Sequence, residues 1–565
     1  MIRSLIRCGV LLGVVGTAAC EMEIANPNQP ETDRVLATAR DVENLLGTQY
    51  LRWHIAMYGS LSNVWGMAQV MSFEDFSSLA NNGMGARISI PRAANDNSVG
   101  NGYATEQSRT FFIHSEVTRI TSNVLAKLAE PDFTLGSPAQ DNRARAFAQF
   151  MRGLAHGYLA LVYDSAAVVT PEMSTEDPGE LADYREVMDT ALSALTQAIT
   201  YANTAASGAN GFPLPASWIP GPTSMTATEF VKLARSYRAR LRASVARTPQ
   251  ERAAVNWDEV IADAANGITA NHYNTTNTVS GPFNTWVNQW LAYTTWHQMT
   301  PFVIGMADNS GAYAAWIATP LANRGAGTSF FMVTPDQRFP QGATRAEQQA
   351  DFALTQCTAA ASVCKRYFVN RPTGNDQFSG ASWGWSNYDH ARFYPWRVSG
   401  SGGTGQNGDF PFMTVAEINL LEAEGHYRKG NYAQAAALIN KTRARTPTAS
   451  QPGGGLPPIT DFDATSPVPG GNNCVPKVPV GPSFTTIACG NMLEALKWEK
   501  RIETAYSHFM AWFLDMRGWG DLPEGTPTDW ATPYQDLQAR GRSGTGIYST
   551  GTGGYHQAAK GTYGW

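Results

Sequence analysis

Apolar and small residues recur at helical spacing on two segments between Met413 and Arg445. The positions are Ile418, Leu421 and Gly425 on the first segment, then Ala435, Leu438 and Ile439 on the second. Gly430 and Asn431 separate the two segments, and both residue types can adopt the positive φ that ends a helix. The spacing is close to that of a tetratricopeptide hairpin. One hairpin cannot bury its own apolar face, so the pattern predicts further hairpins stacked against it.

The same helical pattern recurs along the rest of the chain. In its second clear copy, from Asp141 to Asp164, small and apolar residues follow one stripe of a helix. Further helices are expected at 110–129, 184–202, 226–247, 257–267 and 493–520. Together these segments predict helical hairpins near 110–164, 184–267, 414–445 and 491–517, with a loop-rich insertion at 279–412. The predicted fold class is mainly α: tetratricopeptide-like helical hairpins form a scaffold, and long irregular loop insertions bear the ligand surface.

Irregular segments are expected at two other places. The loop from Ser72 to Gly102 is rich in Asn, Gly and Ser, and the tail from Asp521 to Trp565 is rich in Gly, Ser, Thr and Tyr. The tail is expected to wrap the body without regular structure.

A first helix is expected from about Thr38, with Asp41 as its cap.

Charged residues on two of the expected helices could suggest anion binding or catalysis, but ion pairing explains them better. Arg235, Arg238 and Arg242 form a basic stripe, which an ion-paired or solvated face explains better than anion binding. Glu499 and Glu503 lie one helical turn apart and could be taken for a pair of acid–base catalysts. Because their helix also carries Lys and Arg, we interpret both acids as ion-paired structural residues.

The N-terminus has the pattern of a secretory signal. Arg3 and Arg7 precede a short apolar run, which is followed by Gly-Thr-Ala-Ala and then Cys20. The run is too short to span a membrane. A Cys directly after Ala-Ala resembles a bacterial lipobox, although Thr17 stands where Leu is usual. Residues 1–19 are therefore predicted to be a lipoprotein signal peptide, and 20–33 the lipidated Cys20 and a tether. The alternative is ordinary cleavage beside an incidental Cys.

Composition narrows the class of partner. The 565 residues include 16 Trp, 52 Gly and 32 Pro, which suggests long structured loops rich in aromatic residues. Loss of residues 1–19 removes two arginines and no acid, so the net charge goes from −5 to −7. An acidic chain argues against nucleic acid as the main partner.

Four cysteines remain after Cys8 leaves with the signal and Cys20 carries lipid. Two locally spaced pairs indicate loop-closing disulfides in an oxidising compartment. Three pairings are open, and Cys357–Cys364 with Cys474–Cys489 is the favoured one. Neither pair has the spacing of a metal site, so no metal is expected, and no cofactor motif is present.

Two aromatic stretches of the insertion are candidates for ligand binding. Ser382 to Trp396 lacks any helical or strand period, and its rings could stack on sugars while its polar residues bond to hydroxyls. The candidates there are Trp383, Trp385, Tyr388 and Trp396, with Asn387, Asp389 and Arg392. The second stretch offers Trp286, Trp290 and Trp296, whose spacing also fits a helical core stripe. Plain loop packing is an equal alternative for the first stretch.

One catalytic motif occurs in the same region. Gly380 to Gly384 matches the G-x-S-x-G nucleophile elbow, with Ser382 at its centre. That motif requires an apolar strand before it and a helix after it, and polar residues stand on both sides here. No catalytic residue is therefore assigned.

Three motifs resemble the SusD/RagB family of nutrient-binding outer-membrane lipoproteins. They are Ile439-Asn440 with Arg443 and Arg445, the run from Arg152 to Tyr158, and Glu499 and Glu503 followed by Trp512 to Arg517. The last motif carries one extra residue, Leu514, before Asp515. The resemblance covers nearly all of the mature chain, and its specific motifs lie in the helices. It implies that 34–565 form a single SusD-like helical body.

The resemblance also implies a function. The protein would be a non-catalytic lipoprotein, anchored to the outer membrane by lipid and facing the cell exterior. It would bind a nutrient, a glycan or a peptide, and deliver it to a SusC-like TonB-dependent transporter. A surface hydrolase of polysaccharide or peptide is the alternative from another class, and a scaffold that binds only proteins is a third.

Overall fold

The structure is a computed structural model that describes residues 35–59, 63–77, 87–221, 224–276, 297–324, 330–353, 356, 364–373, 386–392, 408–448, 451–542 and 556–565. Helices dominate these ranges, and the strands are short two-stranded pairs, so the predicted mainly α class is confirmed. Most buried apolar side chains, from Leu36 to Trp565, form one large core cluster, and smaller clusters lie around Leu420 and around Phe352. Within the described ranges, no helix has the length and apolar character needed to cross a membrane.

The predicted array of hairpins is present. Successive helices pack on one another in the order α6, α7, α8, α9, α11, α17, with α18 and α19 packed against α17. Their bounds are Ala104–Ala129 for α6, Pro138–Val162 for α7, Tyr184–Ala206 for α8, Ala227–Ser244 for α9, Trp257–Ala265 for α11, Val415–Arg428 for α17, Tyr432–Arg443 for α18 and Met492–Thr504 for α19. Gly430, at φ +78°, makes the predicted turn between α17 and α18. The apolar pattern therefore located the scaffold correctly.

Glycine lets these helices approach closely. A Cβ on Gly157 of α7 would lie 2.5 Å from Leu241 Cδ1 on α9, and one on Gly425 of α17 would lie 2.6 Å from Ile261 Cγ1 on α11. Real Cβ atoms do not approach so closely, so a side chain at either position would force the facing Leu241 or Ile261 side chain to move.

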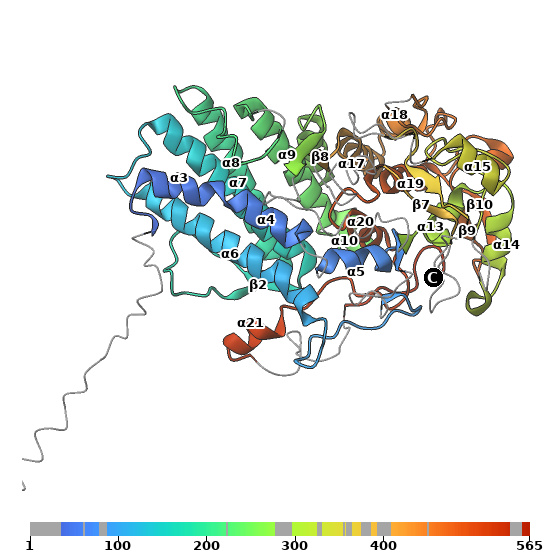
Figure 1. The fold of residues 1–565 in the computed structure, drawn as a ribbon, viewed down its shortest axis with the longest axis horizontal. Helices are drawn as coiled ribbons and strands as arrows, with labels where there is room; N and C mark the ends of the chain where they lie inside the picture. The colour runs from blue at the N-terminus through green and yellow to red at the C-terminus, as the bar shows by residue number, and fades with distance from the viewer. Residues whose placement is uncertain are drawn as a thin grey trace, which may run out of the picture.

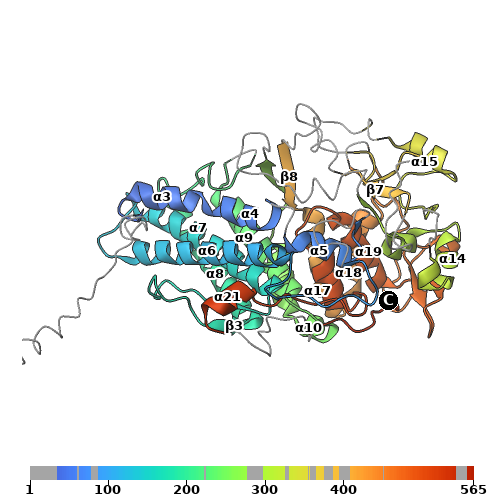
Figure 2. The ribbon, with the colours of Figure 1, turned by 60° about the horizontal axis from the view of Figure 1, so that its bottom comes forward.

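The insertion leaves and rejoins the array at one place. Helices α11 and α17 pack together although about 150 residues separate them in the chain, and strand β4 (His272–Thr276) pairs antiparallel with β8 (Gly408–Met413). The described parts of the insertion are short helices and strands. They are β5 (His297–Gln298), α13 (Pro301–Ile304), η2 (Gly305–Ala307), α14 (Ala312–Ala318), η3 (Leu321–Asn323), α15 (Arg345–Asp351), β6 (Phe368–Asn370) and β7 (Tyr388–His390). Figures 1 and 2 show α14, α15 and β7 at one end of the molecule and α3, α6, α7 and α8 at the other.

The N-terminal helices pack along the array. They are α3 (Ala39–Gly47), α4 (Gln49–Tyr58) and α5 (Val64–Met71). The expected cap is corrected: Thr38 is the N-cap of α3, and Asp41 is the third residue of the helix. The Thr38 hydroxyl oxygen accepts from the Asp41 N–H at 3.2 Å, and the Asp41 carboxylate accepts from the Thr38 N–H at 3.2 Å. This reciprocal capping box satisfies two amides, which Asp41 alone would not do.

The expected helix at 493–520 is interrupted. Helix α19 ends at Thr504, and α20 (Ala511–Trp519) begins only after a six-residue break. Tyr506 and Met510 have φ of 57° and 56° in this break, a conformation that no helix interior contains. The Tyr506 N–H donates to Glu74 Oε1 at 2.6 Å, so a residue from the start of the chain stabilises the break.

The two segments expected to be irregular contain short regular elements. In the loop after α5, Phe76–Ser77 form strand β1, which pairs with β5, and the buried ring of Phe73 stacks on Phe302 at 4.0 Å. The tail crosses the end of α7, where the Trp530 N–H donates to the Val162 carbonyl at 2.9 Å, and it forms helix α21 (Tyr534–Ala539). The remaining elements are α10 (Pro249–Ala254), the strand pairs β2 (Ser165–Ala167) with β3 (Leu181–Asp183) and β9 (Lys477–Val480) with β10 (Thr486–Cys489), and η6 (Gly471–Asn473).

Candidate functional site

A buried ionic cluster joins the insertion to the array. Arg338 of the insertion donates to both carboxylate oxygens of Glu499 at 2.7 and 2.9 Å, and to Glu503 at 3.1 Å, both on α19. Asp336 accepts from the same guanidinium at 2.7 and 2.9 Å. The side chains of Arg338, Asp336 and Glu499 are fully buried. Burial raises the pKa of Glu499, while Arg338 acts in the opposite direction.

This cluster confirms that Glu499 and Glu503 are ion-paired, but the cation comes from far away in the sequence. The basic residues of α19 itself bind other acids: Lys497 and Arg501 pair with Asp521, and Lys500 pairs with Asp515 at 2.8 Å. Every oxygen of Glu499 is engaged by Arg338, so neither acid is placed to transfer a proton to a ligand. Their role is to fix the insertion on the scaffold.

The expected exposure of one candidate ring is wrong. Tyr388 is fully buried in β7, and its hydroxyl lies 2.8 Å from the Met332 carbonyl, to which it donates. Burial raises the pKa of this hydroxyl. The backbone of β7 pairs with β6, so a strand is present where the sequence shows no strand period. Three residues are too few to display the alternation from which a strand is predicted.

The polar candidates beside Tyr388 are also held inside the protein. Asp389 is fully buried and pairs with Arg371 at 3.1 Å, and Asn387 is buried at 4% exposure. Arg392 is half-buried: it donates to the Glu503 carbonyl at 2.6 Å, and its guanidinium lies 4.2 Å from the centre of the Tyr367 ring. Residues 386–392 therefore anchor the candidate stretch, and they do not form its open face.

The remaining aromatic candidates lie outside the described residues. These are Trp383, Trp385 and Trp396 of the first stretch and Trp286, Trp290 and Trp296 of the second, together with Ser382 and Cys20. Their assignment to ligand binding, or to lipidation for Cys20, remains a prediction. The described chain on either side of the Trp383 and Trp385 segment ends at Thr373 and resumes at Ser386, whose hydroxyl donates to the Met299 carbonyl at 2.5 Å.

One expected disulfide is present. Cys474 and Cys489 are bonded, with their Cα atoms 5.8 Å apart, and the bridge joins the segment before β9 to the end of β10. Cys364 is buried and disulfide-bonded, while its expected partner Cys357 lies outside the described residues. Among the residues that the structure describes, no cluster of His, Cys, Asp and Glu is arranged to hold a metal ion.

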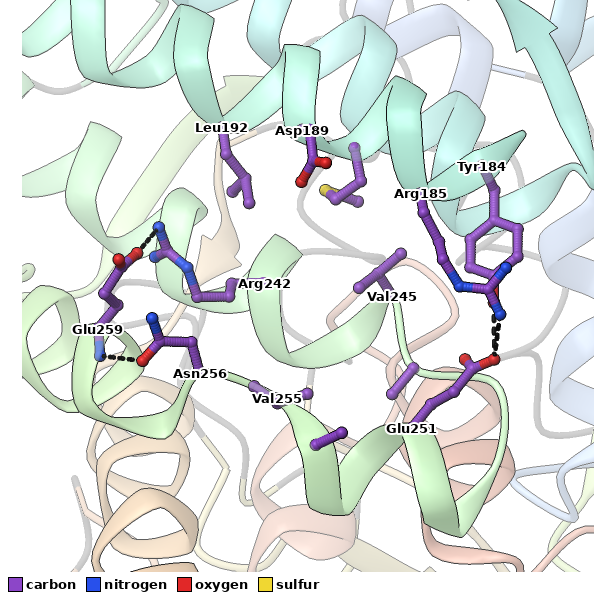
Figure 3. Close-up of a pocket in the computed structure, with 13 residues that line it drawn as sticks. Tyr184, Arg185, Asp189, Leu192, Arg242, Val245, Glu251, Val255, Asn256 and Glu259 are labelled. Atoms are coloured by element: carbon purple, nitrogen blue, oxygen red, sulfur yellow. Dashed lines mark hydrogen bonds and ion pairs between the residues drawn. The ribbon is translucent and has the colours of Figure 1, made fainter. Parts of the chain in front are cut away.

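A groove in the helical half was not expected from the sequence. It lies between α8 on one side and the end of α9, α10 and the start of α11 on the other, and has a volume of about 540 Å³. Figure 3 shows Asp189 and Leu192 projecting from α8 toward Val245 and Val255. Arg242 pairs with Glu259 at one end, and Arg185 pairs with Glu251 at 2.7 Å at the other. The sequence predicted the helix at 184–202 but gave no sign that its edge borders a groove.

The basic stripe of α9 forms part of the same region and is ion-paired, as expected. Asp263 of α11 accepts from Arg235 at 3.3 Å, from Arg238 at 2.7 Å and from Arg242 at 2.9 Å. One buried carboxylate therefore pairs with all three arginines of the stripe.

Comparison with known proteins gives a likeness to solved structures alone. No protein-family model matches the sequence, and no curated protein matches it. The structure is similar to NanU of Bacteroides fragilis at 13% identity, covering 92% of this chain and 98% of that one, with a TM-score of 0.49. It is also similar to a SusD superfamily protein from Parabacteroides distasonis (13% identity, 89% and 98% covered, TM-score 0.47). A SusD-like carbohydrate-binding protein from B. fragilis gives 13% identity, 86% and 87% covered, and a TM-score of 0.48.

The second and third of these structures carry the name of the family that the helical motifs of the sequence resemble. Identities of 13% and TM-scores below 0.5 describe a distant likeness of the fold. The carbohydrate binding named for the third structure belongs to that protein.

Proposed function

We propose that this protein is a lipid-anchored, non-catalytic binding protein of the outer membrane that captures an oligo- or polysaccharide outside the cell. We further propose that it delivers this nutrient to a SusC-like TonB-dependent transporter. The observation that carries the proposal is an aromatic-rich insertion fixed to a helical scaffold. The β4–β8 pair closes its base, and Arg338 ties it to α19. A rigid scaffold that presents variable loops is the usual arrangement for recognition.

The described acids support binding in preference to catalysis. Glycoside hydrolysis requires two carboxyl groups that face one substrate, with one of them able to donate a proton. The carboxylates of Glu499 and Glu503 converge on Arg338, and that of Asp389 on Arg371, so all three are neutralised inside the protein.

The proposal is tested by screening the purified protein on a glycan array and a peptide panel, with product analysis after incubation. Binding of one glycan class without turnover supports it. Turnover of a glycan or peptide would instead establish the surface hydrolase, and binding to peptides alone would change the nutrient class.

The aromatic loop can be tested by the double substitution Trp383→Ala with Trp385→Ala. Each ring stacked on a sugar contributes on the order of 1 kcal/mol beyond area burial, so loss of both should weaken glycan affinity about thirtyfold. Isothermal titration calorimetry measures the affinity, and a thermal melt measures stability. The control is Phe462→Ala, which removes a ring that is 50% exposed outside the insertion and should leave affinity unchanged. A large fall in melting temperature with unchanged affinity would make both tryptophans core residues.

The membrane anchor can be tested by Cys20→Ser. This variant should lose its lipid and be released from membranes, because the remaining apolar run is removed with the signal. Fractionation and metabolic labelling with a fatty acid measure the change in cells that lack the transporter. Cys8→Ser is the matched control, since Cys8 lies inside the signal and should not alter attachment. Membrane retention of the Cys20→Ser protein would refute the lipoprotein assignment.

A further inference from the structure

We propose that the groove between α8 and the α9–α11 segment binds an internal segment of a partner polypeptide, in which a basic side chain lies next to apolar ones. The groove has an apolar floor, which Met188, Leu192, Val245, Ala246, Ala254 and Val255 form. Its volume of about 540 Å³ is within the usual range for binding pockets. Helix α8, which forms one side of the groove, lies toward the end of the molecule opposite α14, α15 and β7 of the insertion (Figure 1).

The charges around the groove favour a basic occupant. Glu251 already accepts from the Tyr184 hydroxyl, Arg185 Nη2 and the Arg247 N–H, at 2.7, 2.7 and 2.8 Å. Glu259 is paired with Arg242. Asp189 is the one acid of the groove for which the described structure contains no ion pair or hydrogen bond, and its side chain points into the space above Val245 (Figure 3). A Lys or Arg that enters beside it would gain a charge-assisted hydrogen bond.

The same charges disfavour a free peptide or a small anion. A free peptide carries an α-carboxylate, which requires an unpaired cation or backbone amides. Arg185 is neutralised by Glu251, and Arg242 by Glu259 and Asp263 at 2.9 Å. Both arginines that line the described groove are therefore already ion-paired, and an internal segment, whose termini lie elsewhere, brings no carboxylate that requires a cation.

The groove also lacks the surface that a sugar requires. Its single aromatic residue, Tyr184, is buried, with guanidinium groups of Arg247 and Arg185 at 3.5 and 4.4 Å from the centre of its ring. A sugar ring stacks on an exposed aromatic face, and the groove offers aliphatic side chains instead. Apolar side chains beside a basic residue fit that floor better than a glycan does.

The proposal is tested with the purified full-length protein and the capped tripeptide acetyl-Leu-Lys-Leu-amide as probe, by isothermal titration calorimetry. We expect Asp189→Asn to weaken binding about five- to tenfold, because one charged contact is lost at a partly solvated site. The matched control is Glu186→Gln, an exposed acid in the first turn of the same helix that does not line the groove. The affinity of this variant should stay within about twofold of that of the unaltered protein, because Glu186 does not contact the probe.

Two further arms separate the alternatives. Ala254→Leu should abolish binding without lowering the melting temperature, because Ala254 is exposed and the added side chain occupies the groove. The uncapped peptide Leu-Lys-Leu should bind more weakly than the capped one. Equal affinity of the uncapped peptide would overturn the internal-segment proposal, and so would unaltered affinity in Asp189→Asn or no binding of the capped probe. A glycan bound at the insertion should not compete, so failure here is distinguishable from failure of the proposed nutrient binding.

Discussion

Replacing Arg338 by Ala should lower the free energy of unfolding by about 3–5 kcal/mol, the usual cost of removing one partner from a buried ion pair. The effect is large because one buried guanidinium bridges three carboxylates. Without it, Asp336 and Glu499 would lose the cation that they share, and Glu503 would keep its pair with Arg445 at 3.4 Å. Asp336 would also lose the partner that orients it toward Trp498, whose indole N–H donates to it at 2.9 Å. Urea unfolding monitored by tryptophan fluorescence measures the change.

Two variants establish that burial causes this effect. Arg338→Lys keeps the charge but cannot reach both Glu499 oxygens and Asp336 with a planar fork, so it should fall between the wild type and Arg338→Ala. Arg542→Ala removes an ion pair with Glu180. The Arg542 and Glu180 side chains are 42% and 91% exposed, and such an exposed pair contributes about 0–1 kcal/mol to the free energy of unfolding. Equal losses for Arg338→Ala and Arg542→Ala would mean that the Arg338 cluster does not hold the insertion in place.

The sequence predicted those parts of the fold that depend on local pattern. The helices of the array were located to within a few residues because each must bury one apolar stripe. Gly153, Gly157 and Gly425 belong to that stripe and occupy close helix crossings. The break after α19 could not be predicted in the same way. No Gly or Pro marks it in the sequence, and its Tyr506 N–H donates to Glu74, more than 400 residues away in the chain.

The burial and pairing of the candidate site residues could be predicted only where they do not depend on partners that are distant in the sequence. The ion pairing of Glu499 and Glu503 was expected, but its cation, Arg338, comes from the insertion and has no fixed spacing to them. Tyr388 and Asp389 were expected to be exposed because their stretch is rich in Gly and polar residues. An ion pair with the buried Arg371 helps to make the burial of Asp389 possible. The groove beside Asp189 requires three segments to be positioned together, which no local pattern encodes.

Two buried glutamates should respond to pH in opposite directions. Burial raises the pKa of Glu74 from 4.5 to about 8, and the neighbouring Asp75 adds to this. Burial alone would raise the pKa of Glu424 too, but Arg252, Lys500 and Arg428 together lower it below its ordinary value. Arg252 binds both Glu424 oxygens, at 2.9 and 2.6 Å, whereas no cation contributes to the shift at Glu74 among the residues that the structure describes. The same residue type at the same burial is therefore neutral in one place and ionised in the other.

Glu74→Gln should therefore stabilise the protein in alkaline solution. Between pH 4.5 and about 8 the folded state keeps a proton on Glu74 that the unfolded state has lost. The free energy of unfolding then falls by about 1.4 kcal/mol for each pH unit in this window. Gln keeps the shape and the acceptor for the Tyr506 N–H but cannot ionise, so the variant should gain on the order of 4 kcal/mol over the wild type at pH 9 and about nothing at pH 4.5.

The comparison variant is Glu424→Gln, whose effect should have the opposite sign. A lowered pKa contributes stability that is present above pH 4.5 and is lost as the pH falls further, so Glu424→Gln should destabilise the protein at pH 7 by about 3 kcal/mol or more. Urea midpoints measured from pH 4.5 to 9 separate the two, with Glu180→Gln, at 91% side-chain exposure, as the control without a slope. A wild-type protein whose stability does not fall between pH 5 and 8 relative to Glu74→Gln would show that Glu74 is ionised in the fold. The break at Tyr506 would then be stabilised by a charged acceptor.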